Sequence, residues 1–181
     1  MNGGKFQRGV ADSVREIVFG LEDSLVSTLG TVTGIAAGAG STYIVILSGL
    51  VLVAVESLSM SAGSYLSSKS AAEVITAVEG VEGKAEVAHI RPVRNGIVMG
   101  VFYLVGGMVP LVPYFLLPID LAYGPSIAAT ALCLFALGAW KSRLAKRPIV
   151  SGGMEMVSVS LGAALLGFII GRVVNSFYQN S

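Results

Sequence analysis

The sequence predicts an all-α membrane protein with five transmembrane helices in each protomer. Of its 181 residues, 54% are hydrophobic and 13% are charged, and the mean hydropathy is +0.77. Soluble domains carry about 25% charged residues, and each transmembrane helix needs about 20 predominantly apolar residues. A chain of this length therefore has room for roughly five spans and for no separate soluble domain of useful size.

Five apolar stretches mark the expected spans, at residues 17–38, 43–66, 93–117, 122–140 and 149–174. The first pair is separated by residues 39–42 and the third and fourth by residues 118–121, which suffices only for tight turns. Residues 67–92 form a short connection that is long enough to have structure of its own. We treat residues 1–181 as a single transmembrane domain.

The basic residues predict the orientation of these spans. Three precede the first span, four lie between the second and third, and four lie between the fourth and fifth, which leaves Arg172 at the far end of the fifth. Because cytoplasmic segments carry the excess of Lys and Arg, we expect a cytoplasmic N-terminus, a cytoplasmic 67–92 connection and a C-terminus on the opposite side. The polar first 16 residues show no removable signal peptide.

Carboxylates inside two spans are the main functional signal. Glu22 and Asp23 lie in the first span and Glu56 lies in the second, and neither span contains a basic residue. An ionisable group at membrane depth costs about 2.5–3.5 kcal/mol on insertion scales and persists mainly beside water, a partner group or a transported ion. The missing basic partner points to a cation.

Helical geometry places Glu16 and Asp23 on one face of the first helix, whereas Glu22 points about 100° away. Counted from Arg15 at about 1.5 Å per residue, Asp23 lies roughly 12 Å into the membrane. Glu16 is either the first ligand of an ion path or a solvated ion pair with Arg15.

Glu56 and Met60 share a face of the second helix, one turn apart. Counted from Lys69, Met60 lies about 13 Å deep and Glu56 about 20 Å deep, so we expect Met60 nearly level with Asp23 and Glu56 farther along the path. Carboxylate oxygens suit Mg²⁺, Ca²⁺ and Mn²⁺, a thioether favours softer late first-row ions, and Fe²⁺ fits a mixed set. The alternative for Met60 is a core-filling role.

The 67–92 connection carries a group of acidic residues and the single histidine: Glu73, Glu79, Glu82, Glu86 and His89. This group either collects divalent cations at the entrance or forms a solvated charged face. A phosphate-binding loop, a His pair and a second cysteine beside Cys133 are all missing from the sequence, so we expect no enzyme activity and no cofactor.

Small residues recur at four-residue spacing in three spans, as Gly30-x3-Gly34-x3-Gly38, Gly96-x3-Gly100 and Gly167-x3-Gly171. Such ridges allow close approach of a second helix. Five helices rarely enclose a pore alone, so the ridges either join two protomers or pack helices within one.

Three segments, "VREIVFGLEDSLVSTLGTVTGIAAG", "SLSMSAGSYLSSKS" and "GGMVPLVPY", resemble the vacuolar iron transporter family with its nodulin-like and bacterial relatives. The resemblance covers nearly the whole chain. It implies a five-helix homodimer with the ion path between the protomers, and proton-coupled export of Fe²⁺, often with Mn²⁺, from the cytosol. It also implies metal-binding roles for Asp23, Met60 and Glu16.

Two features depart from the family pattern. Many members have a glutamate two turns before the methionine, where this chain has Leu52, and Glu56 lies one turn closer to Met60. Many members also carry a long, glutamate-rich cytosolic metal-binding domain between the second and third helices, and here that connection is short.

The sequence therefore predicts a homodimeric, secondary-active divalent metal exporter that binds Fe²⁺ or Mn²⁺ at Glu16, Glu22, Asp23, Glu56 and Met60 and exchanges it for protons. A passive divalent cation channel and a non-transporting membrane scaffold are the alternatives. The membrane would be the cell membrane in a prokaryote and a vacuolar or other organelle membrane in a eukaryote.

Overall fold

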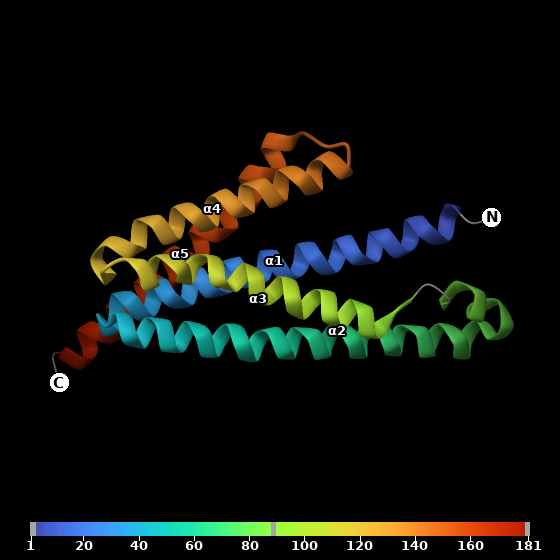
Figure 1. Cartoon of the computed structure of the whole chain (residues 1–181), viewed down its shortest axis with the longest axis horizontal. Helices are drawn as coiled ribbons and strands as arrows, with labels where there is room; N and C mark the ends of the chain where they lie inside the picture. Colours follow the sequence, from blue (N-terminus) through green and yellow to red (C-terminus); the bar gives the residue numbers. More distant parts are fainter. Residues whose placement is uncertain (1–2, 88–89, 180–181) are drawn as a thin grey trace.

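The computed structural model describes residues 3–87 and 90–179, with side-chain positions for residues 13–78, 87 and 90–178. The chain folds into five α-helices: α1 (Gly3–Ala39), α2 (Thr42–Val87), α3 (Pro92–Leu116), α4 (Ile119–Leu144) and α5 (Ile149–Gln179). They run lengthwise beside one another (Figure 1). The N-terminal end of the bundle holds the N-terminus and the α2–α3 and α4–α5 connections. The C-terminal end holds the C-terminus and the other two connections.

The turns between helices are tight, as the sequence predicts. Gly40 joins α1 to α2 with a φ of +59°, a left-handed conformation that glycine adopts at no steric cost. Leu117 is extended between α3 and α4, and Lys146, with a φ of 55°, lies between α4 and α5. These short connections force sequential helices to be antiparallel.

The second helix is longer than the sequence analysis placed it. Residues 67–87, assigned to a connection, continue α2 to Val87, and its last turns bend back toward the start of α3 (Figure 1). The stretch "SAAEVITAV" contains several good helix formers, and two glycines do not end the helix because each costs only about 1 kcal/mol. Helix α3 begins at Pro92.

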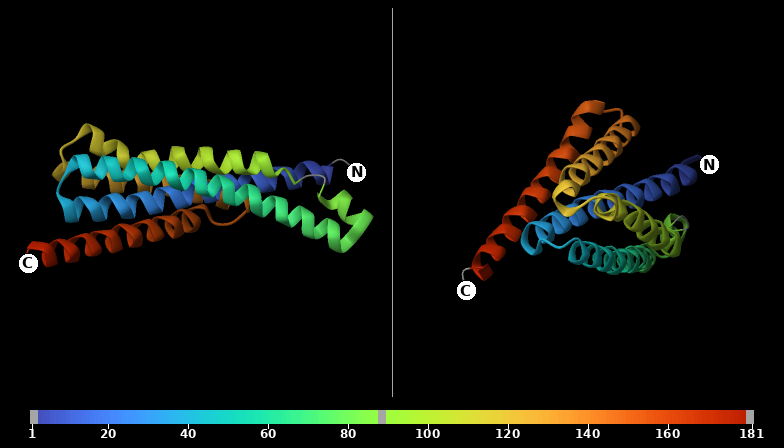
Figure 2. Two further views of the ribbon diagram at one scale, coloured as in Figure 1. Left: turned by 90° about the horizontal axis from the view of Figure 1, so that it is seen from below. Right: turned by 60° about the vertical axis from the view of Figure 1, so that its left-hand side comes forward.

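Helix α1 lies at the centre of the bundle and contacts all four other helices (Figure 2). Within the described residues, four helical segments are long and apolar enough to cross a membrane: Thr42–Val78, Pro92–Leu116, Ile119–Leu144 and Ile149–Tyr178. Helix α1 is not among them. It carries Glu22 and Asp23, and its neighbours surround it, so a fifth span remains a prediction.

All three glycine ridges pack helices within the chain. A Cβ added at Gly34 would lie 2.7 Å from the carbonyl oxygen of Gly167, and one at Gly38 would lie 3.0 Å from that of Gly171. A Cβ at Gly96 would lie 2.8 Å from the carbonyl oxygen of Ser61. The first and third ridges thus join α1 to α5, and the second joins α3 to α2. The ridges therefore do not indicate a dimer interface.

Candidate metal-ion path

A cavity of about 370 Å³ lies between α1, α2 and α3 near the N-terminal end of the bundle. Its lining combines one carboxylate, two thioethers and two hydroxyls with a guanidinium at the edge: Arg15, Glu16, Phe19, Met60, Gly63, Ser64, Ser67 and Met99. Two of the predicted ligands, Glu16 and Met60, therefore share one cavity although 44 positions separate them in the sequence.

Glu16 is held rigidly in this cavity. Its side chain is 2% exposed, the Ser64 hydroxyl donates a 2.8 Å hydrogen bond to Oε2, and Nη2 of Arg15 donates one of 2.6 Å to Oε1. The ion pair with Arg15 that the sequence suggested is present, but the carboxylate is buried rather than solvated. A buried carboxylate with one oxygen on a neutral donor is a plausible ligand for an incoming cation.

Met60 and Met99 bring two thioether sulfurs to the same cavity from different helices. Met60 is partly buried, whereas Met99 is 4% exposed and packs against Gly20. The sequence analysis missed Met99, although Asn95 and Tyr103, four residues to either side, share its helix face. It also missed Ser64 and Ser67, although their spacing of four and seven residues from Met60 places all three on one helix face.

The Glu16–Ser64 hydrogen bond fixes the register of the antiparallel helices α1 and α2. Asp23 is seven residues farther along α1, and the residue seven positions back along α2 is Ser57, next to Glu56. Asp23 and Glu56 are close enough for their charges to repel each other. The register therefore places the two carboxylates inside the spans at about the same level.

This arrangement corrects the order expected from counting residues. Met60 lies between the levels of Glu16 and Asp23, and Glu56 is beside Asp23 rather than deeper. The error arose because Lys69 was taken to be level with Arg15. In the observed register Lys69 lies four residues, or about 6 Å, beyond that level.

Tyr103 of α3 completes the surroundings of the carboxylate pair. It is fully buried, its hydroxyl shares a 3.0 Å hydrogen bond with Ser27 of α1, and it interacts electrostatically with both Asp23 and Glu56. Tyr103 is 11 residues after the start of α3 and 13 before its end, so the pair lies halfway along a helix long enough to cross a membrane. An isolated tyrosine in an apolar span gave the sequence analysis no signal.

The remaining acidic candidates do not join these two groups. Glu22 is partly buried on another face of α1 and does not line the cavity. Glu73 is exposed and pairs with Lys69 at 3.8 Å, which fits the solvated alternative. The side chains of Glu79, Glu82 and Glu86 are outside the described positions, and His89 is outside the described residues. In the part described, no three His, Cys, Asp or Glu side chains form a group that can hold a metal.

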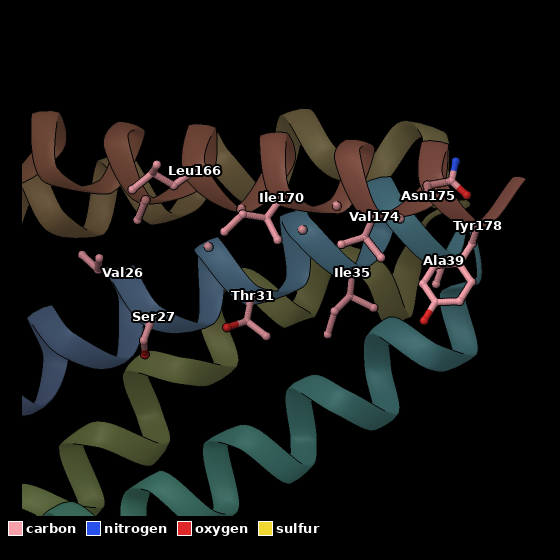
Figure 3. Close-up of a pocket in the computed structure, with 16 residues that line it drawn as sticks. Val26, Ser27, Thr31, Ile35, Ala39, Leu166, Ile170, Val174, Asn175 and Tyr178 are labelled. Carbon is pink, nitrogen blue, oxygen red and sulfur yellow. The ribbon is translucent and has the colours of Figure 1, made fainter. Parts of the chain in front are cut away.

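An open groove of about 810 Å³ begins at Val26 and Ser27, about one helical turn beyond Asp23, and extends toward the C-terminal end of the bundle. It lies between α1 and α5, with Ser27 and Thr31 as hydroxyl groups among apolar residues such as Ile35, Leu166 and Ile170 (Figure 3). Ser27 belongs both to this groove and to the hydrogen bond with Tyr103. It thus links the carboxylate level to the groove.

Comparison with known proteins gives one consistent family. The model of the VIT family matches residues 14–85 and 79–172 of this chain. Vacuolar iron transporter 1 of Arabidopsis thaliana is 24% identical over 215 residues, which cover 89% of this chain and 86% of that protein. Vacuolar iron transporter 2 of Oryza sativa subsp. japonica is 27% identical over 206 residues, or 83% of each chain. An uncharacterized protein of Methanocaldococcus jannaschii is 29% identical over 168 residues, or 86% and 87% of the two chains.

The alignments with the two plant transporters are longer than this chain, so they contain positions that have no residue here. The family model matches in two segments, which overlap at residues 79–85 in the last turns of α2. The apolar helices and these relatives identify an integral, multi-pass membrane protein.

Proposed function

This chain belongs to the VIT family, and from that premise we propose that it exports Fe²⁺, and also Mn²⁺, from the cytosol in exchange for protons. The names of the relatives support transport of iron. The observation that carries the proposal is the meeting of Asp23 and Glu56 beside Tyr103, halfway along α3. Two carboxylates at one level offer hard oxygen ligands to a divalent ion.

In this proposal the ion enters at the N-terminal end of the bundle, through the cavity that holds Glu16. It then passes the Met60 sulfur, which lies between Glu16 and the carboxylate pair. The mixture of oxygen and sulfur ligands favours Fe²⁺ over Mg²⁺ or Ca²⁺. The hydroxyls of Ser27 and Thr31 continue the polar lining into the groove beyond the pair.

Proton exchange follows from the chemistry of the pair. Asp23 and Glu56 repel each other when both are charged, and either a divalent cation or a proton relieves that repulsion. Metal and proton compete for the same oxygens, so binding of one releases the other. A proton gradient across the membrane can therefore drive metal transport in the opposite direction.

We further propose that two copies of the chain form the complete path. Asp23 and Glu56 are both partly exposed on the single chain, and charged groups at membrane depth rarely face hydrocarbon. A second copy related by two-fold symmetry would cover this surface and the adjoining groove and would double the number of carboxylates at this level.

The decisive experiment measures flux through the purified protein in proteoliposomes with an imposed pH gradient. Asp23→Asn removes a charge with little change in volume, so we expect loss of Fe²⁺ transport without loss of folding or assembly. Glu22→Gln, on another face of α1, is the matched control and should retain most of the flux. Wild-type transport by Asp23→Asn would refute the path, and flux indifferent to the pH gradient would favour a passive channel.

A further inference from the structure

A second cavity, distinct from the proposed path, opens between α4 and α5 at the C-terminal end of the bundle. Its volume is about 610 Å³ and part of α1 forms its floor. The two helices diverge toward this end (Figure 2, right). The walls are apolar, with Ile127, Leu161, Leu165 and Phe168, and the mouth carries Asp120, Tyr123 and Arg172.

The divergence of α4 and α5 has a structural cause. At the N-terminal end of the bundle, glycines bring the helices together, since a Cβ added at Gly138 would lie 3.0 Å from Cα of Gly153. Farther along, Gly167 and Gly171 hold α5 against α1 instead. Helix α5 therefore follows α1 and separates from α4, which leaves a space that opens sideways toward the membrane.

The mouth of this cavity carries one positive and one negative charge. Arg172 is the basic residue that lies at the opposite end of the spans from the other Lys and Arg residues. Arg172 and Asp120 both line the cavity together with Tyr123. Both are exposed, and among the described residues no ion pair joins them. The mouth thus presents two separate, opposite charges to a ligand.

A buried hydroxyl without a partner also lines the cavity. Thr33 is 2% exposed, and its Oγ1 makes no hydrogen bond. A buried hydroxyl that makes no hydrogen bond destabilises the folded protein, so binding of a ligand that offers a hydrogen-bond partner is favoured. Because Gly34 faces Gly167, Thr33 is level with Leu166, six residues below Arg172. The hydroxyl lies between the charged mouth and the apolar interior.

We propose that this cavity binds one phospholipid with a zwitterionic, primary-amine headgroup. The phosphate pairs with the Arg172 guanidinium and the ammonium group pairs with Asp120, while the ester region lies at the level of Thr33. One acyl chain follows the walls from Leu165 to Leu161. Leu161 is 11 residues, or about 16 Å, below Arg172. Such a lipid has a partner for each of the two charges and for the Thr33 hydroxyl, and its acyl chain fits the apolar interior of the cavity.

Native mass spectrometry of the full-length protein tests this assignment, with phosphatidylethanolamine and phosphatidylglycerol of identical acyl chains as probes. We expect the wild type to retain phosphatidylethanolamine preferentially. Arg172→Gln should lower that retention about tenfold, the effect of one lost charge-assisted hydrogen bond. Asp120→Asn should lower retention of phosphatidylethanolamine but not of phosphatidylglycerol, because only the first carries an ammonium group.

Arg94→Gln, which removes an exposed charge at the other end of the bundle, is the matched control. Equal retention of phosphatidylethanolamine by Arg172→Gln and Arg94→Gln would overturn the proposal, as would equal binding of both lipids to the wild type. Leu165→Cys, made together with Cys133→Ser because Cys133 is exposed, gives a second measurement that does not depend on charge. A disulfide between two copies at this position in bilayers would show that a second protomer, not a lipid, covers the cavity, whereas its absence together with lipid retention supports the assignment.

Discussion

The Ser64 hydroxyl donates a 2.8 Å hydrogen bond to Oε2 of Glu16, and this contact joins α2 to α1 at the entrance of the proposed path. Because the helices are antiparallel, the same contact sets the level at which Asp23 and Glu56 meet. This hydrogen bond thus orients Glu16, the first proposed ligand, and its register places Asp23 and Glu56 at the same level.

Removal of that hydroxyl should weaken metal capture. In Ser64→Ala, Glu16 keeps Arg15 as its partner and loses the neutral donor, so the carboxylate turns toward Arg15. We expect about three- to tenfold lower Fe²⁺ flux at low metal concentration, the effect of one hydrogen bond, and nearly normal flux at saturation. Ser67→Ala, in the same cavity, is the control. An equal loss of Fe²⁺ flux in both variants would mean that any substitution in the cavity reduces transport and that the Ser64 hydrogen bond has no special role.

Met60 should determine selectivity more than turnover. Met60→Leu keeps the apolar volume and removes the sulfur, so Fe²⁺ flux should fall more than Mn²⁺ flux. Met99→Leu provides a matched control, because Met99 lines the same cavity but is buried against Gly20. Competition between the two ions in one flux assay measures the ratio. A uniform loss for both ions in Met60→Leu would indicate a packing role.

The sequence predicted the helices and most turns well because most of the apolar segments reach membrane length, whereas the end of helix α2 was not predicted. Composition changes at residue 67, from apolar to polar, but helix propensity does not. A hydropathy boundary is a membrane boundary and need not be the end of a helix.

The site was predictable helix by helix but not across helices. Glu16, Asp23, Glu56 and Met60 were proposed from their depth and helix face, and the first two and Met60 also from the family resemblance. Their relative levels, and the contributions of Met99 and Tyr103 from α3, depend on packing between helices. Gly20 illustrates this, since a Cβ there would lie 3.0 Å from the carbonyl oxygen of Met99. No spacing within one helix encodes that contact.

The glycine ridge of α1 should control stability rather than assembly. A side chain at Gly34 would press on the Gly167 backbone, which cannot move as a side chain can. We expect Gly34→Val to lower stability by about 1–3 kcal/mol, seen as earlier thermal unfolding in detergent. Gly162→Val, where a Cβ meets nothing within 4 Å, should change it little. If Gly34→Val instead abolished dimers while the thermal stability stayed unchanged, the ridge would have to lie at the interface between protomers.

Topology can be tested by labelling single cysteines. Cys133 is exposed and must first be replaced by Ser. Cysteines at Ser41 and Asp120 should then react with a membrane-impermeant reagent from outside, and one at Lys146 only from the cytoplasm, as the distribution of basic residues predicts. Ser142 is a poor position for this purpose because it is 5% exposed. Equal labelling of Lys146 and Asp120 would disprove the five-span arrangement.

Glu56 is where this chain departs from the family pattern, and it should couple metal to protons. Because Glu56 lies beside Asp23, Glu56→Gln leaves one carboxylate at this level, able to hold metal weakly but with less proton exchange. We expect the ratio of protons to metal ions to fall while some Fe²⁺ flux remains, measured by simultaneous recording of internal pH and metal. Leu52→Glu together with Glu56→Gln returns a carboxylate to the same helix face one turn away and should restore part of the ratio. Leu52→Gln with Glu56→Gln, the control without charge, should not. If Glu56→Gln changes neither the metal flux nor the proton flux, Glu56 is structural, and Asp23 alone must bind both the metal ion and the proton.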